Sequence, residues 1–79
     1  MPGLRQRVID AICQEAWPHP DHEVNSTTIS ERLKRNGVNT SKVEVRQALF
    51  QLKDQKDITL VVDPRSGLVV QDVDPELCP

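Results

Sequence analysis

Residues 24–52 decide the fold, and they read VNSTTISERLKRNGVNTSKVEVRQALFQL. Two short helical patterns lie in this stretch, and a tight turn joins them. Asn25 is well suited to cap the first helix, and Ile29 and Leu33 give that helix its short buried face. Gly37 predicts where the helix ends, because glycine readily takes the left-handed conformation that closes a helix.

The second helix of this stretch begins after Ser41 and is expected to run to about Gln55. Ser41 and Glu44 have the spacing of a capping box, in which each side chain satisfies a backbone N–H of the other residue. One apolar stripe at i, i+3, i+4 and i+7 is predicted to face the core and consists of Val45, Ala48, Leu49 and Leu52. The residues expected to face outward are Val43, Arg46, Gln47, Phe50, Gln51 and Asp54.

Before these helices, residues 4–17 predict another helix. Four apolar residues recur at every fourth position, and they are Leu4, Val8, Ile12 and Ala16. Pro18 and Pro20 are expected to end this helix, because proline lacks a backbone N–H and restricts the residue before it. A loop is therefore expected over residues 18–22.

After these helices the period of the sequence changes from helical to strand-like. Residues 58–62 and 68–71 are mostly β-branched or aliphatic, and residues 63–67 between them predict a turn. These segments therefore predict a β-hairpin. In the expected register the four residues that face the core are Leu60, Val62, Leu68 and Val70, with Val62 opposite Leu68. Val61 and Val69 are expected to pair on the other face.

The order of helix, helix, tight turn, helix and hairpin resembles the winged-helix subgroup of helix-turn-helix domains. The resemblance extends over about residues 4–72, and its matching residues are Val24 through Leu33, Gly37-Val38, Ser41 with its apolar stripe, and Ile58. It implies an α+β fold that is mainly α, with three helices and a C-terminal hairpin as the wing. We therefore expect residues 1–72 to form one domain. Residues 73–79 are expected to be a flexible, acidic, proline-containing tail that folding does not need.

Charge is distributed unevenly along the chain, although the net charge is only −2. Residues 26–56 carry seven basic and three acidic side chains, whereas residues 57–79 carry one basic and five acidic side chains. Charges act over only about 8 Å at physiological salt, so the local excess of positive charge decides what this region attracts. The resemblance implies that the third helix enters the DNA major groove and that the wing contacts the backbone or the minor groove.

The leading hypothesis is a small sequence-specific DNA-binding protein, either a transcriptional regulator or a replication accessory factor, that uses no cofactor. Arg46 has the donors to pair with guanine, and Gln47 has the groups to pair with adenine. Arg65 lies at the expected tip of the wing, where a guanidinium can enter a minor groove. The candidate DNA-contacting residues are Thr40, Lys42, Val43, Arg46, Gln47 and Arg65.

The competing hypothesis is a winged-helix module for protein–protein contact. Val43 and Phe50 lie seven residues apart on the outward helix face and together suggest an apolar patch, unless Phe50 tucks beneath the wing. The pair Val61 and Val69 is a second candidate patch. Low net charge and the acidic tail also favour a protein partner. A monomer or weak dimer is expected, because residues 72–79 are too short and proline-rich to form a dimerisation helix.

Several other classes of function are disfavoured by the sequence. A chain of 79 residues without a nucleophile–base pair or a Gly-rich phosphate loop is not expected to be an enzyme. No apolar run approaches the roughly 20 residues that span a bilayer, so we expect no membrane association and a cytoplasmic or nucleoid-associated location. Cys13 and Cys78 are expected to be reduced thiols. With His19 and His22 nearby, Cys13 still does not make a convincing metal site.

Overall fold

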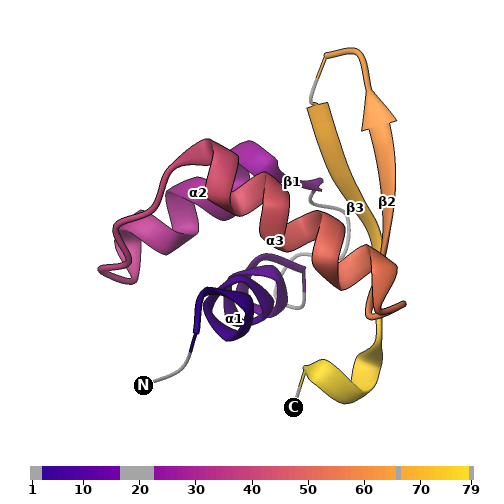
Figure 1. Cartoon of the computed structure of the whole chain (residues 1–79), viewed down its shortest axis with the longest axis horizontal. Helices are drawn as coiled ribbons and strands as arrows, with labels where there is room; N and C mark the ends of the chain where they lie inside the picture. The colour runs from indigo at the N-terminus through magenta and orange to yellow at the C-terminus, as the bar shows by residue number, and fades with distance from the viewer. Residues whose placement is uncertain (1–2, 17–22, 66, 79) are drawn as a thin grey trace.

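The computed structural model describes residues 3–16, 23–65 and 67–78, and these form three α-helices beside an antiparallel sheet (Figure 1). The helices are α1 (Leu4–Ala16), α2 (Ser26–Arg35) and α3 (Lys42–Asp54). The strands are β1 (Val24–Asn25), β2 (Ile58–Asp63) and β3 (Gly67–Val73), and the 3₁₀ helix η1 (Pro75–Leu77) follows them. The predicted α+β layout of three helices and a hairpin is confirmed at this level. The loop predicted over residues 18–22 lies outside the described residues.

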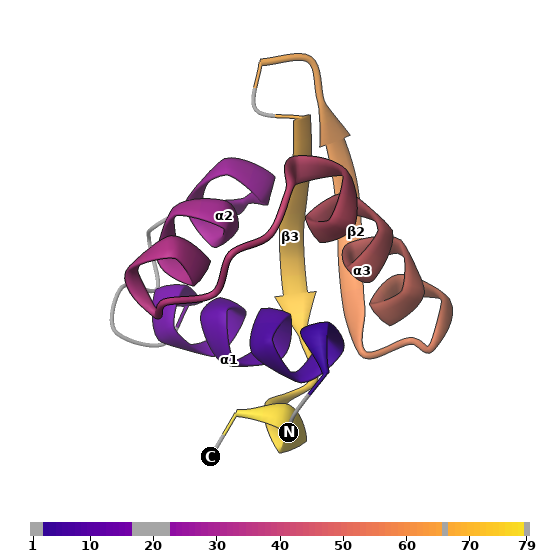
Figure 2. The ribbon, with the colours of Figure 1, turned by 60° about the vertical axis from the view of Figure 1, so that its left-hand side comes forward.

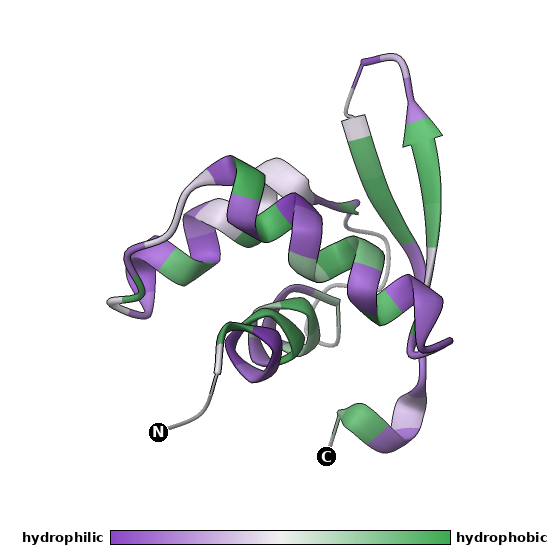
Figure 3. Ribbon diagram, in the orientation of Figure 1, coloured by the Kyte–Doolittle hydropathy of each residue, from purple (hydrophilic) through white to green (hydrophobic). Residues whose placement is uncertain are grey.

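The core lies where the three helices meet in front of β3 (Figure 2). Its most deeply buried side chains come from all three helices, and they include Val8, Ile12, Ile29, Leu33, Val45, Leu49 and Leu52. These are the residues that the helical spacing placed inside. In Figure 3 the hydrophobic positions of α1 lie toward the other helices and its hydrophilic positions lie away from them. Aliphatic packing therefore holds the helices in place.

Both α2 and α3 begin at their predicted capping residues. The Asn25 side-chain oxygen accepts a hydrogen bond from the backbone N–H of Thr28 at 2.9 Å. The Ser41 hydroxyl accepts one from the backbone N–H of Glu44 at 3.2 Å, and the Glu44 carboxylate accepts one from the Ser41 N–H in return. Local hydrogen bonds thus fix the first turn of each helix.

The two helices also end alike, with a residue in the left-handed conformation. Gly37 after α2 has a φ of 79°, and Lys56 after α3 has a φ of 64°. In both cases the next backbone N–H returns to the helix, from Val38 to the Leu33 oxygen at 2.8 Å and from Asp57 to the Leu52 oxygen at 2.9 Å. Both ends are therefore Schellman motifs, although one of them uses lysine where glycine is favoured.

Substitutions at these two helix ends are expected to change stability in opposite directions. Gly37→Ala places a Cβ in the left-handed region and is expected to lower the free energy of unfolding by about 1 kcal/mol. Lys56→Gly removes such a Cβ and is expected to raise it by about 0.5–1 kcal/mol. Urea denaturation of both variants measures the difference. If the free energy of unfolding changes in the same direction in both variants, the two helix ends do not share the left-handed geometry.

The sheet has the strand order β1-β3-β2, with β3 in the middle. The predicted hairpin register is confirmed, since Leu60 pairs with Val70, Val61 with Val69 and Val62 with Leu68. A register shift between Thr59 and Leu60 and the two-residue strand β1 were not predicted. Strand β1 pairs with β3, with Val24 opposite Val70 and Asn25 opposite Val69, so it ties the start of α2 to the hairpin.

The prediction that Val62 faces the core is wrong. Its partner Leu68 is buried, with 4% of its surface exposed, but Val62 is 75% exposed. Strand β3 lies between β1 and β2 and contacts α2, whereas β2 is an edge strand of the sheet. The hairpin also extends beyond the helices toward its tip (Figure 1), so no helix covers the last part of β2.

The segment after β3 also differs from its prediction as a loose tail. Pro75–Leu77 form η1, whose Asp74 cap accepts a hydrogen bond from the Glu76 N–H at 3.0 Å. Leu77 packs against the core, and Cys78 is 6% exposed. Cys78 forms a disulfide with Cys13 of α1, so the prediction of two reduced thiols is wrong as well. Strand β3 carries the chain back toward α1, and this return brings together two cysteines separated by 65 positions.

None of the described helices is both long enough and apolar enough to cross a membrane.

Candidate nucleic-acid interface

A surface groove lies between α3, the first residues of α2 and the β2–β3 hairpin. Residues far apart in the sequence line it, and they are Ser26, Thr27, Lys42, Val43, Arg46, Phe50, Val62, Arg65, Gly67 and Leu68. One wall comes from α3 between Lys42 and Phe50, and the other comes from the part of the hairpin next to its turn. We call it the α3–hairpin groove.

Three cationic side chains converge on the α3–hairpin groove. Lys42 and Arg46 project from the first two turns of α3, and Arg65 projects from the turn of the hairpin. All three residues are exposed. The backbone N–H of Arg65 donates to the Asp63 carboxylate at 2.7 Å, which fixes the turn that presents the guanidinium. Three residues that the sequence singled out for DNA contact therefore lie on one concave surface.

Two other predicted residues lie outside this groove. Gln47 is exposed, but it lines a separate hollow that includes Leu4, Arg5 and Gln51, on the α1 side of α3. Thr40 is half-buried, and its hydroxyl oxygen is shielded from solvent with no hydrogen-bond partner in the structure. In this conformation the buried oxygen is not placed to meet an external phosphate. The role of Thr40 as a phosphate donor stays a prediction.

Thr40 instead belongs to the wall of a smaller hollow between α2 and α3. The other residues of that hollow are Thr27, Ser30, Glu31, Lys34 and Lys42. Lys42 thus borders both hollows, and Lys34 adds a second exposed cation to the smaller hollow. The positive charge around the start of α3 comes from both helices of the pair.

Apolar side chains also line the α3–hairpin groove. Val43 is 63% exposed, Phe50 is 42% exposed and Val62 is 75% exposed, and all three border it. Val43 and Phe50 were singled out from the sequence. Val62 was missed because it shares a sheet face with Leu68 and was therefore expected to face the core. Val61 is exposed and Val69 is half-buried, but neither lines this groove.

Part of the positive charge predicted for residues 26–56 is used inside the fold. Arg32 donates from its Nε to the Glu15 carboxylate at 2.8 Å, and Glu15 is only 8% exposed. This pair joins α2 to α1 and satisfies a buried carboxylate, as burial of a charge requires. Arg32 therefore serves packing rather than ligand binding.

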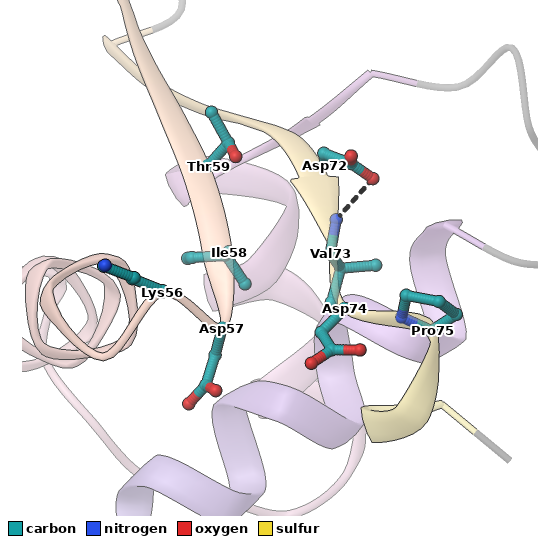
Figure 4. A pocket seen from close by; sticks show the side chains of 8 residues that line it. All are labelled: Lys56, Asp57, Ile58, Thr59, Asp72, Val73, Asp74 and Pro75. Atoms are coloured by element: carbon teal, nitrogen blue, oxygen red, sulfur yellow. Dashed lines mark hydrogen bonds between the residues drawn. The ribbon is translucent and has the colours of Figure 1, made fainter.

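Acidic residues lie close together at the end of the sheet away from the hairpin turn, where β2 begins and β3 ends (Figure 4). Asp57, Asp72 and Asp74 line a hollow there together with Lys56. Each carboxylate already has a partner, since Asp57 pairs with Arg5 at 2.7 Å, Asp72 accepts from the Val73 N–H at 2.9 Å, and Asp74 caps η1. The described residues contain no group of three or more side chains placed to hold a metal ion.

Comparisons of the chain with protein-family models, curated proteins and solved structures find no match. The functional argument therefore depends on the groove and on the charges around it.

Proposed function

We propose that this protein is a small DNA-binding protein with a winged helix-turn-helix fold, acting as a transcriptional regulator or a replication accessory factor. In this proposal α3 enters the major groove and the β2–β3 hairpin is the wing that contacts the backbone or the minor groove. The protein acts as a monomer or weak dimer and uses no cofactor. A cytoplasmic or nucleoid-associated location is part of the proposal.

The observation that carries the proposal is the convergence of Lys42, Arg46 and Arg65 on the α3–hairpin groove. DNA presents closely spaced phosphates, and neutralising them releases counterions and supplies most of the non-specific affinity. Two cations on the start of a helix and one on a neighbouring hairpin match the separate contacts that a groove-bound helix and a wing would make. The acidic end, with Asp72 and Asp74, lies on the other side of the protein and would face away from DNA.

The three cations have different roles in the proposed DNA complex. Arg46 lies within the first two turns of α3 and projects outward, so it is placed to reach guanine O6 and N7. Lys42 at the start of α3 and Arg65 in the hairpin turn are placed for phosphates. Base contact is assigned to Arg46 ahead of Gln47, because Gln47 lies on the α1 side of the helix.

Substitution of Arg46 and Arg65 is expected to weaken DNA binding in two distinguishable ways. Arg46→Ala is expected to cost about 1–3 kcal/mol at a preferred site and to blur preference at one base pair. Arg65→Ala is expected to weaken all sequences alike and to reduce the dependence of log affinity on log salt by about one unit. Fluorescence anisotropy with selected and random duplexes at two salt concentrations measures both effects.

The matched control is Lys56→Gln, which removes a positive charge at the acidic end of the protein (Figure 4). It is expected to leave the affinity nearly unchanged, because Lys56 lines the acidic hollow and not the α3–hairpin groove. Absence of salt-dependent binding to any duplex at low salt would overturn the proposal. Equal losses in all three variants would show attraction by net charge without a defined interface.

The disulfide sets a condition on this experiment. Disulfides are rare in reducing compartments, so the binding titration is run on both the oxidised and the reduced protein. The hairpin tip and η1 lie at opposite ends of the molecule (Figure 1). We therefore expect the same affinity in both redox states wherever the protein is folded.

A further inference from the structure

DNA binding leaves the exposed apolar side chains of Phe50 and Val62 in the α3–hairpin groove unexplained. Four large hydrophobic residues are exposed in the described part of the chain, and three of them, Val43, Phe50 and Val62, line this one groove. Buried Leu68, the hairpin partner of Val62, continues the apolar surface. Exposed apolar groups gathered on one concave surface are typical of a protein-binding site.

The spacing of these residues matches one face of a helix. Val43 and Phe50 lie seven residues apart on α3, which places them about 10.5 Å apart along the helix axis. A partner helix lying along the groove repeats its apolar side chains at i, i+3, i+4 and i+7 and covers the same length. Val62 on the hairpin borders the groove opposite α3, so the partner would contact both walls.

The positive charges that line the groove favour a partner of negative charge. The same groove is lined by three cations, and they are Lys42, Arg46 and Arg65. Complementary charge steers association and rejects basic partners. We propose that the α3–hairpin groove binds an acidic amphipathic helix of another protein, and that this helix displaces DNA by occupying the same three cations. The displacement of DNA rests on the proposed DNA binding. Docking of the helix in the groove does not depend on DNA binding.

The test uses a synthetic 16-residue peptide of Leu, Glu and Ala whose leucines form one stripe at i, i+3, i+4 and i+7. The control peptide has the same composition, with its leucines placed so that they form no stripe. Amide chemical-shift changes in the ¹⁵N-labelled protein are expected at α3 and the hairpin with the striped peptide only. Equal binding of both peptides would show simple charge attraction and would overturn the proposed docking mode.

Val62→Thr and Val61→Thr provide a matched pair of variants on the same strand. Threonine keeps the shape of valine and its preference for strands, so both variants are expected to fold. Val62→Thr is expected to weaken binding of the striped peptide by about fivefold to tenfold, since it puts a hydroxyl on the apolar wall. Val61 is 42% exposed but does not line the groove, so Val61→Thr is expected to leave the affinity unchanged.

Competition separates this inference from the proposed function. Addition of the striped peptide is expected to release a labelled duplex from the protein, while the control peptide is not. If DNA binds but the peptide does not, this inference fails and the proposed function stands. If the peptide binds but no duplex does, the groove is a protein-binding site and the DNA proposal fails. Simultaneous binding of both ligands would overturn the shared-site claim.

Discussion

Loss of the Cys13–Cys78 disulfide is expected to lower the free energy of unfolding by about 4 kcal/mol. The bond closes a loop of 65 residues, and in the chain-entropy account a closed loop of this length restricts the unfolded chain by that amount. A domain of this size has a total stability of only about 4–12 kcal/mol. Removal of the bond is therefore expected to leave a marginally stable protein.

The variant that tests this is the double substitution Cys13→Ala with Cys78→Ala, compared with the wild-type protein in urea. Alanine is chosen because Cys78 is buried and a serine hydroxyl there would need a partner. A reducing agent is expected to bring the wild-type protein to the stability of the double variant and to leave the double variant unchanged. Two thiols that react with an alkylating agent in the air-oxidised, folded protein would contradict the bond.

Leu49→Ala is expected to destabilise the protein by about 2–5 kcal/mol. Leu49 is fully buried in the middle of α3, among Ile12, Leu33 and the other core residues contributed by α1 and α2. Truncation removes apolar area from the core and leaves a cavity that tightly packed neighbours fill only in part. The melting temperature is expected to fall by about 10 °C or more, since 1 kcal/mol corresponds to about 4–8 °C in a domain of this size.

Gln51→Ala is the matched control for Leu49→Ala. Gln51 lies two residues further along α3 and is exposed, so its truncation is expected to change stability by less than about 0.5 kcal/mol. Thermal unfolding followed by circular dichroism compares the two variants in the same helix. A melting temperature that does not change in Leu49→Ala would show that the stripe on α3 is not part of the core.

The helices could be predicted from the sequence because their signals are local. The caps at Asn25 and Ser41, the end at Gly37 and the apolar stripe through Leu49 each depend on residues within two turns of one another. The hairpin register was predictable for the same reason, since a short turn determines which residues of two neighbouring strands pair.

The candidate site was predictable in part. Helical periodicity predicted that Val43, Arg46 and Gln47 face outward, and the structure confirms that they are exposed. Periodicity gives the angle of a residue around its own helix but not what lies beside that face. It therefore did not distinguish Arg46, in the α3–hairpin groove, from Gln47, on the α1 side, and it did not reveal that the Thr40 hydroxyl oxygen is buried.

The sequence by itself determined the helix ends, the buried stripes and the hairpin pairing, because neighbouring residues set the local backbone and alternate sides of each element. Only the tertiary structure decided which distant segments meet. It brings Cys78 to Cys13, pairs Arg32 with buried Glu15, and places Arg65 opposite Arg46 across a groove. These contacts depend on how helices and strands pack in three dimensions. Packing must bury apolar side chains and pair buried charges over the whole chain at once. No single stretch of sequence therefore specifies these contacts.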